Sequence, residues 1–298
     1  MKPWRSRTEA TSSGHDYASV QTVSTFLLVQ FGVSVKFGSD GNVQAAMRSD
    51  GNIGLIGYGR FGEMWARTLA TISPTLVYDQ KWEQAESVPA LPKPLQAASL
   101  EQVAGSDLLF LSVPISELET CCRHLSPLLS AHTLVVDVCS VKVHPAKVMR
   151  DTLKPDQPLL GTHPLFGPDS VARLGLSGRK IVLCPLRASS EQTRVLRAIF
   201  ERLELQIIEA TPDEHDQQMA HSQALVHLLG RALTKLSLDA QEISTPDYES
   251  LLNIRSFVNN DTWQLFFDMQ RYNPYAQQMR RTLRASLDDL EARIQSGR

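Results

Sequence analysis

The sequence has few cysteines, and their spacing suits neither a metal site nor a disulfide framework. The four cysteines of the 298-residue chain are Cys121, Cys122, Cys139 and Cys184. No two of them form the C-x-x-C pair of zinc and redox sites, and four cysteines are too few for a disulfide framework in a chain of this size. The histidines at 215, 221 and 227 are six residues apart, which scatters them around a helix axis. We therefore expect reduced thiols, no metal site and a cytoplasmic protein.

The chain also lacks an excess of positive charge and long apolar runs. Thirty Lys and Arg residues stand against 32 Asp and Glu residues, a formal net charge of −2. The chain therefore has no excess of positive charge with which to bind phosphates, and this argues against nucleic-acid binding. The apolar runs fall short of the ~18 residues that span a bilayer, which argues against a membrane protein. With 42% apolar and 21% charged residues, the composition is that of an ordinary globular protein.

Residues 1–50 show no periodicity and are rich in Ser, Gly, Thr and Gln. Arg5 and Arg7 among hydroxyl residues give a weak likeness to a plastid transit peptide, but the early Glu9 and Asp16 argue against one. We expect an N-terminal extension that is dispensable, with a plastid address as the alternative. A chain that begins at Met47 is then expected to fold and to keep full activity.

From residue 52 the sequence alternates between strand and helix signals. Short apolar runs predict buried strands at 53–57, 75–78, 107–113, 133–138, 159–162, 181–184 and 205–209. Helical patterns lie at 61–72, 115–129 and 190–203, and later at 212–240, 246–259, 261–271 and 274–295. The predicted fold class is α/β: a Rossmann-type, doubly wound parallel sheet over residues 51–210, followed by an all-helical domain over residues 211–298.

The first predicted strand runs into a glycine-rich loop. Gly57, Tyr58, Gly59, Arg60, Phe61 and Gly62 form G-x-G-x-x-G between a strand and a helix. In this context the first glycine permits the turn, the second lets backbone approach a pyrophosphate, and the third lets helix and strand pack closely. The helix N-terminus then faces the phosphates. The loop predicts a dinucleotide site, and a glycine-rich turn without a ligand is the alternative.

Two further strand ends complete the predicted cofactor site. Asp79 ends the second strand, where a carboxylate accepts hydrogen bonds from ribose and repels a 2′-phosphate. This favours NAD, with NADP as the alternative because Lys81 is near, and Asp79 could instead serve only a turn or a helix cap. Ser112, Val113 and Pro114 close the next strand-to-helix turn, where the central part of the cofactor is expected to pass.

Polar residues follow the next two strands. Ser140 lies in Asp-Val-Cys-Ser-Val-Lys at 137–142, and His163 lies in Gly-Thr-His-Pro-Leu-Phe-Gly-Pro at 161–168. Ligands bind at the carboxyl ends of parallel strands, so both residues should face the nicotinamide. A histidine there is a natural proton acceptor, and Pro164 restricts its backbone to extended conformations. The alternatives are a turn histidine and, for Ser140, a helix N-cap.

These two blocks resemble the prephenate/arogenate dehydrogenases of tyrosine biosynthesis. The likeness continues in Glu-His-Asp at 214–216, in Gln223 and in His227. The stretches 248–253 and 272–276 look like the plant-type arogenate dehydrogenases. The resemblance covers about residues 52–290 and implies a homodimer with interlocked helical domains. It implies NAD-dependent oxidative decarboxylation of prephenate or arogenate, with His163 accepting the proton of the C4 hydroxyl and Ser140 orienting that hydroxyl.

The substrate of such an enzyme carries two carboxylates, which are best held by cationic or forked donors. Gln223, His227 and Arg231 form one stripe at i, i+4 and i+8 of the predicted helix 212–240. The stripe could equally be the solvated face of the helix, but the resemblance favours substrate contact. It also implies an Arg for the ring carboxylate, with Arg255 and Arg231 as rival candidates. Asp216 is expected to attract the amino group of arogenate, or else to cap its helix.

Two other classes remain open at this point. A dehydrogenase of the β-hydroxyacid type would share both domains but commonly uses a Lys of the helical domain as its acid/base group. A non-catalytic dinucleotide-binding regulator would need the loop at 57–62 but not Ser140 together with His163.

Overall fold

The computed structural model describes residues 52–84, 90–236 and 238–297. The expectations for residues 1–50, including the start at Met47, lie outside these ranges. Within them, no helix is both long and apolar enough to cross a membrane. Nor do three or more His, Cys, Asp or Glu side chains come together in a way that could hold a metal ion.

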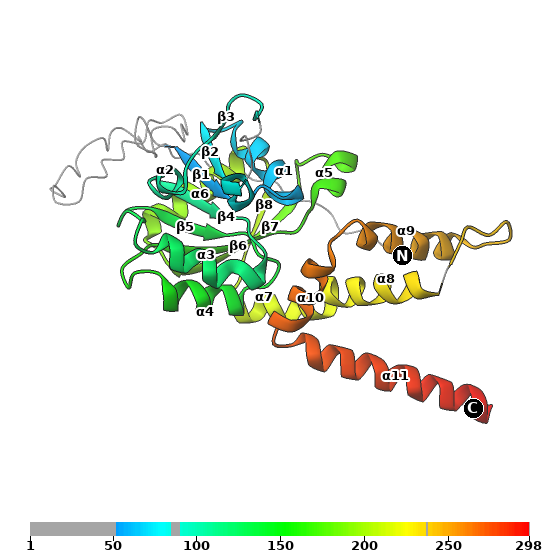
Figure 1. Ribbon diagram of the computed structural model, residues 1–298. Coiled ribbons are helices and arrows are strands. Elements are labelled where there is room, and N and C mark those ends of the chain that lie inside the picture. The colour runs from blue at the N-terminus through cyan, green and yellow to red at the C-terminus, as the bar shows by residue number, and fades with distance from the viewer. Residues whose placement is uncertain (1–51, 85–89, 237, 298) are drawn as a thin grey trace, which may run out of the picture. The chain divides into compact units, whose positions relative to one another are not determined.

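The described chain forms one eight-stranded sheet, in which the strand order is β3-β2-β1-β4-β5-β6-β7-β8 (Figure 1). The strands are β1 (Ile53–Ile56), β2 (Thr75–Tyr78), β3 (Leu95–Ala97), β4 (Leu108–Leu111), β5 (Leu134–Asp137), β6 (Leu159–Pro164), β7 (Lys180–Arg187) and β8 (Gln206–Glu209). All seven predicted strands are present, and β3 was not predicted. The order reverses between β1 and β4, which makes that edge of the sheet the expected place for a dinucleotide.

The predicted parallel sheet is confirmed except at one pairing. Strands β1 to β6 are parallel, whereas β7 runs antiparallel to β6 and β8 runs parallel to β7. The chain between β6 and β7 contains only the short helix α5 (Pro168–Leu174), and it returns along the edge of β6 rather than crossing over the sheet. The sheet is therefore mostly parallel, with two strands of opposite direction at one edge.

Helices cover both faces of the sheet, as the alternating pattern predicts. Helices α1 (Arg60–Leu69) and α6 (Ser190–Arg202) share one apolar core, in which the buried Trp65 contacts the rings of Phe110, Phe166 and Phe200. The opposite core holds α2 (Leu100–Ala104), α3 (Leu118–Leu125) and α4 (Val143–Thr152). Short 3₁₀ turns η2 (Gln80–Gln84) and η3 (Ile115–Glu117) follow β2 and β4.

The chain after β8 is helical, as predicted, but the long helix expected at 212–240 is interrupted. It consists of α7 (Pro212–Met219), a π-helical turn η4 (Ala220–Ala224) and α8 (Leu225–Lys235). Three more helices follow: α9 (Pro246–Asn259), α10 (Trp263–Tyr272) and α11 (Ala276–Ser296). The hydroxyls of Thr211, Thr245 and Thr262 cap α7, α9 and α10 by accepting hydrogen bonds from backbone N–H groups of the first turn. A π turn adds one residue per turn, and such turns are frequent at functional sites.

Candidate active site

The glycine-rich loop has the geometry that a dinucleotide needs. Gly57 has a φ of +96°, which only glycine adopts easily, and its N–H donates to the carbonyl of Tyr78. A Cβ on Gly62 would lie 1.9 Å from the carbonyl oxygen of Gly57, so this position requires a glycine to let α1 approach β1. A Cβ on Gly59 would meet nothing within 4 Å. The space over Gly59 is open, and no side chain caps the N-terminus of α1.

Asp79 is anchored beside this loop. One carboxylate oxygen accepts a hydrogen bond from the Tyr58 N–H at 2.7 Å, and the other accepts one from the Lys81 N–H at 2.9 Å. The contact to Lys81 is the turn role that the sequence left open, and the contact to Tyr58 fixes the carboxylate against the loop. Asp79 remains half-buried, so its remaining lone pairs can reach a ribose.

The other residues of the predicted cofactor site lie around the same turn. The Ser112 N–H donates to the Ile56 carbonyl at 2.7 Å, and the Ser112 carbonyl carbon and oxygen border Gly57. Val113 and Pro114 continue from there into η3. The side chain of Phe61 turns away to stack on Trp65, so only the backbone of that residue is available to a phosphate.

Arg60 connects the loop to two distant segments. Its guanidinium donates to Asp169 at the start of α5 and to the carbonyl of Asn260 between α9 and α10, at 2.7 and 2.6 Å. The side-chain amide of Asn260 donates to the other oxygen of Asp169 at 3.2 Å. The side chain of Arg60, predicted to bind cofactor, is therefore occupied by protein contacts in this structure.

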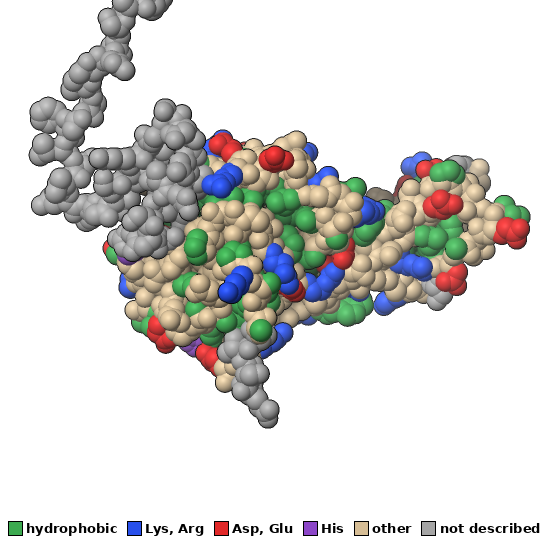
Figure 2. Space-filling model, turned by 90° about the horizontal axis from the view of Figure 1, so that it is seen from above, with side chains coloured by type: hydrophobic (Ala, Val, Ile, Leu, Met, Phe, Trp, Pro, Cys, Tyr) green, Lys and Arg blue, Asp and Glu red, His purple; other side chains and the backbone are tan. Residues whose placement is uncertain are grey.

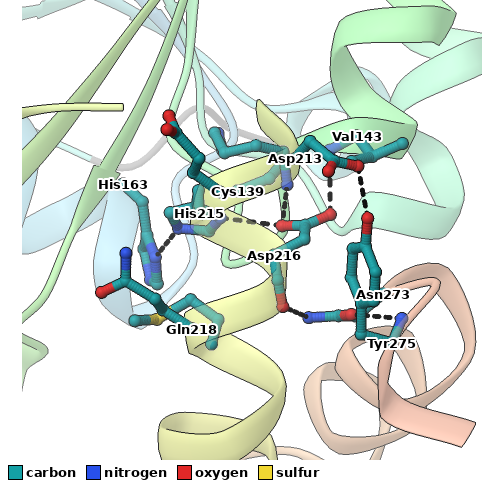
Figure 3. Close-up of polar contacts among 12 residues, drawn as sticks. Cys139, Val143, His163, Asp213, His215, Asp216, Gln218, Asn273 and Tyr275 are labelled. Carbon is teal, nitrogen blue, oxygen red and sulfur yellow. Dashed lines mark hydrogen bonds and ion pairs between the residues drawn. The ribbon is translucent and has the colours of Figure 1, made fainter. Parts of the chain in front are cut away.

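The central feature of the site is a chain of three buried residues (Figure 3). Nδ1 of His163, at the end of β6, lies 2.8 Å from Nε2 of His215 in α7. Nδ1 of His215 lies 2.7 Å from a carboxylate oxygen of Asp216. All three side chains are nearly or fully excluded from solvent.

This arrangement assigns the proton on each ring. A carboxylate only accepts, so the Asp216 contact places the hydrogen of His215 on Nδ1 and leaves a lone pair on its Nε2. That lone pair accepts the hydrogen of His163 Nδ1. Nε2 of His163 then carries the free lone pair, and no other described residue hydrogen-bonds it. The chain of contacts prepares His163 to accept a proton through Nε2.

The electrostatic surroundings keep this pair neutral. Burial holds the pKa of His163 well below its usual value, and the neighbouring His215 and Lys142 lower it further. Burial also lowers the pKa of His215, against the opposing effect of its hydrogen bond to Asp216. At neutral pH the His163 imidazole is therefore neutral, which is the form that can accept a proton.

Asp216 has a different role from the one predicted. It is completely buried, and besides His215 its carboxylate accepts the backbone N–H groups of Lys142 and Val143, at 2.7 and 2.9 Å. Lys142 is the N-cap residue of α4 and Val143 is its first residue, so Asp216 caps that helix rather than its own. With all these donors in place and no exposed surface, the carboxylate cannot receive a substrate amine, which corrects the expected amine contact.

Ser140 lies half-buried in the turn between β5 and α4. Its alternative role as the cap of α4 is not realised, because Asp216 takes the N–H groups at that end. Ser140 and His163 follow the adjacent parallel strands β5 and β6, whose pairing ends at Asp137 and Gly161. Both residues therefore lie just beyond the same edge of the sheet.

The polar stripe of Gln223, His227 and Arg231, which runs from η4 into α8, faces inward rather than toward solvent. His227 and Arg231 are buried, whereas Val226 and Leu229 on the other side of the helix are 42% and 39% exposed. Buried polar atoms without a hydrogen-bonding partner occur on three successive members of the stripe: Gln223 Oε1, His227 Nδ1 and Arg231 Nε. The solvated-face alternative is thus wrong, and the stripe offers unused polar atoms.

The two rival arginines lie in different places. The guanidinium of Arg231 stacks 4.2 Å above the Trp263 ring and donates to the Asp261 carbonyl at 2.5 Å. Arg255 donates to the carbonyl of Leu238, in the connection between α8 and α9. Arg231 shares its surroundings with His227, whereas no contact joins Arg255 to any other predicted site residue in the described chain.

Sequence reasoning missed two residues of this site. His215 was noticed only as part of the family resemblance, and Lys142 only as part of the block at 137–142. A useful signal for His215 would have been a histidine next to an aspartate in the first turns of a helix that directly follows the sheet.

Comparison with known proteins identifies the family. A family model described as the nucleotide-binding domain of prephenate dehydrogenase matches residues 74–209, and one described as a TYRAAT1-like C-terminal domain matches residues 232–297. Arogenate dehydrogenase 1, chloroplastic, of Arabidopsis thaliana is 29% identical over 281 residues, which is 88% of this chain and 42% of that protein. Arogenate dehydrogenase 2 of the same plant is 30% identical over 237 residues, 75% of this chain and 64% of that protein. The chain belongs to the prephenate/arogenate dehydrogenase family.

Solved structures agree on the fold of this family member. A prephenate dehydrogenase from Aquifex aeolicus, in complex with hydroxyphenyl propionate and NAD⁺, gives a TM-score of 0.63 at 18% identity, covering 83% of this chain and 91% of that one. The arogenate dehydrogenase of Synechocystis gives 0.57 at 21% identity, covering 83% and 92%. The chain spans about half the length of the plant relatives, and most of the length of these two structures.

Proposed function

We propose that the protein is a dehydrogenase that oxidatively decarboxylates prephenate, arogenate or both, as its family membership implies. The observation that carries this proposal is His163, which is held by His215 and Asp216 with its Nε2 lone pair free at the carboxyl edge of the sheet. The glycine-rich loop lies at the carboxyl end of β1 in the same sheet. A base and a dinucleotide loop on one edge are what a dehydrogenase needs.

The described residues fit a dinucleotide. Open space over Gly59 and the uncapped N-terminus of α1 suit a pyrophosphate, and Asp79 suits the adenosine ribose. We propose NAD as the cofactor because a carboxylate at this place repels a 2′-phosphate, with NADP as the less favoured alternative. The bound nicotinamide would supply the hydride acceptor for C4 of the substrate ring. The backbones of residues 57–62 and 112–114 would hold and orient it.

In the proposed reaction, the protein mainly manages one proton. Nε2 of His163 accepts the proton of the C4 hydroxyl as that carbon is oxidised, and Ser140 orients the hydroxyl by a hydrogen bond. The ring carboxylate then leaves as CO₂, its electron pair makes the ring aromatic, and the phenolate oxygen takes the proton back from His163. Base catalysis of this kind is typically worth about 10²–10⁴ in rate.

We propose that the inward-facing stripe of α8 binds the substrate carboxylates. Gln223, His227 and Arg231 keep unsatisfied polar atoms in a region sheltered from water, where hydrogen bonds to an anion are strong. Arg231 is favoured over Arg255 because it is the one that lies beside His227. With the amine contact to Asp216 withdrawn, nothing in the described site favours arogenate over prephenate, and we propose both as substrates.

The β-hydroxyacid alternative is disfavoured by the lysines. Residues 211–298 contain a single lysine, Lys235, and it lies exposed at the end of α8. It cannot supply an acid/base group inside the site. The alternative of a non-catalytic dinucleotide-binding regulator gives no role to the buried pair of His163 and His215.

We also propose that the helical domains of two chains associate. Val226 and Leu229 are exposed on the side of α8 opposite to the buried His227 and Arg231, and Leu287, Leu290 and Ile294 are exposed on α11. On the face of the molecule that Figure 2 shows, hydrophobic side chains also lie at the surface among charged ones. Sedimentation of the purified chain tests this: a dimer that Val226→Glu/Leu229→Glu converts to monomer supports it, and a monomeric wild type overturns it.

The experiment for the activity is direct. Purified protein is mixed with prephenate or arogenate and with NAD or NADP, and reduced cofactor is followed by absorbance while the aromatic product is identified by chromatography. We expect hydroxyphenylpyruvate from prephenate, tyrosine from arogenate, and a higher kcat/KM with NAD than with NADP. No reduced cofactor with either substrate would refute the proposed activity.

A further inference from the structure

Lys142 is a fully buried lysine close to the proposed base. Its side chain is 1% exposed, and its ammonium contacts the carboxylate of Asp137, which is equally buried. The same ammonium donates to the carbonyl of Thr162 at 2.5 Å. Taking two charges out of water is costly, so a buried ion pair is weak evidence for stability and calls for another explanation.

The contacts of Lys142 join the two strand ends that carry the site. The pairing of β5 with β6 ends at Asp137 and Gly161, and one residue further on the Lys142 ammonium takes the Thr162 carbonyl in place of a backbone donor. The hydroxyl of Thr162 donates in return to the Asp137 carbonyl at 2.7 Å. The lysine thus extends the connection between the strands beyond the last backbone pair, to the residue directly before His163.

The main chain of Lys142 reaches the same site from another direction. Its N–H donates to the Asp216 oxygen that also accepts the hydrogen of His215. One residue therefore contacts β5, β6 and α7, and it lies two positions from Ser140. Gly161 leaves room for this arrangement, because a Cβ there would lie 3.3 Å from Asp137 and 3.4 Å from the Lys142 side chain.

We propose that Lys142 is a positioning residue that fixes His163 and Ser140 relative to one another and presents a buried positive charge to the histidine pair. The charge opposes protonation of His163, together with burial and His215. The network also contains two acidic groups, and neither of them contacts His163. Asp137 of β5 pairs with Lys142, and Asp216 of α7 contacts His215. The effect of Lys142 on the position and protonation of His163 is a property of the folded protein. Only the expected effect on turnover rests on the proposed function.

The test removes the buried ion pair of Lys142 and Asp137 as a unit and follows the protonation of His163. Lys142→Met alone would leave the Asp137 carboxylate buried without a partner and could prevent folding. Asp137→Asn alone would leave the Lys142 ammonium unpaired in the same way, so we compare the wild type with Asp137→Asn/Lys142→Met, which removes both buried charges together. Lys154→Met is the matched control, since Lys154 is a partly buried lysine that donates to the Leu129 carbonyl away from the site.

The readout is the protonation of each histidine, measured by NMR on protein labelled with ¹⁵N-histidine, with the His163 signals assigned through His163→Asn. We expect the protonation midpoint of His163 to rise by about one pH unit from the wild type to the double variant, and not to move in Lys154→Met. A rise is due to the lysine, because loss of the Asp137 charge would act in the opposite direction. The midpoint pH of the acid limb of kcat/KM should rise by the same amount. A midpoint equal in the wild type and in the double variant would overturn the role of Lys142. A shifted midpoint in a protein that turns over neither prephenate nor arogenate would support Lys142 and refute the proposed function instead.

Discussion

Nδ1 of His163 and Nε2 of His215 lie 2.8 Å apart although the two residues are 52 positions apart in the chain. One belongs to the last residues of β6 and the other to the first turn of α7, so the contact depends on how the helical segment packs against the sheet. It gives His163 a fixed orientation and a fixed tautomer, which a lone histidine at a strand end would not have.

Removing the acceptor of this contact should impair the base without removing it. In His215→Phe the ring volume is retained, but His163 Nδ1 loses its partner and the tautomer is no longer fixed. We expect kcat to fall about 10-fold or more, with the Kd for NAD unchanged, measured by steady-state kinetics and by cofactor titration. His221→Phe, on the exposed part of the same segment, is the control. An unchanged kcat in His215→Phe would show that His163 needs no such support.

Asp216→Asn separates the buried role of this residue from a direct substrate contact. The amide cannot accept all three donors that the carboxylate accepts, so α4 loses part of its cap and His215 loses its orientation. We expect kcat/KM to fall by a similar factor for prephenate and for arogenate, with a lower melting temperature. A loss confined to arogenate would restore the amine contact that the structure argues against.

In the glycine-rich loop, two alanine substitutions should both weaken NAD binding, but only one of them should lower stability. Gly62→Ala places a Cβ 1.9 Å from the Gly57 carbonyl, so α1 must move, and we expect a loss of several degrees in melting temperature together with weaker NAD binding. Gly59→Ala meets nothing within 4 Å, so stability should be kept while the Kd for NAD rises, because the methyl group occupies the approach of the pyrophosphate. Calorimetric titration and thermal melting measure both. Normal NAD affinity in Gly59→Ala would mean that the cofactor does not pass over this loop.

His227 predicts a loss of stability in acid. Burial, with the charge of Arg231, lowers the pKa of His227 from its ordinary 6.5 to about 4 in the folded chain. Above pH 6.5 both states are neutral, whereas below it the unfolded chain binds a proton that the folded chain refuses, so the free energy of unfolding falls until about pH 4. Between pH 7 and 4.5, the free energy of unfolding should fall by about 2 kcal/mol less in His227→Gln than in the wild type. Urea denaturation measures this difference. His221→Gln, which is exposed, should follow the wild type, and equal slopes for all three proteins would contradict the buried neutral state.

Much of the fold follows from local patterns. The apolar runs located seven strands to within a few residues, because strands buried on both faces leave short, dense hydrophobic segments. β3 was missed since its three residues include only one that is buried, Leu95. The reversal at β7 could not be predicted, because an apolar run does not encode the direction in which it enters a sheet.

The site divides in the same way. Gly57, Gly62 and Asp79 act within about twenty residues of each other, and their spacing predicted their geometry. His215 and Asp216 meet His163 and α4 only through the packing of the helical segment on the sheet, which no spacing reveals. The stripe at 223, 227 and 231 was found by its helical period, but whether it faces inward depends on α9 and α10, so the direction had to come from the structure.

The most direct measurement is the pH dependence of kcat and kcat/KM for the wild type and for His163→Asn, with arogenate and prephenate in turn and NAD in excess. Asparagine keeps a similar size and one hydrogen bond but cannot accept the proton. We predict that kcat falls roughly 10²-fold or more, that NAD affinity hardly changes, and that the fall in rate toward low pH disappears. Near-normal turnover by His163→Asn, with the acid limb intact, would contradict the assignment of His163 as the base.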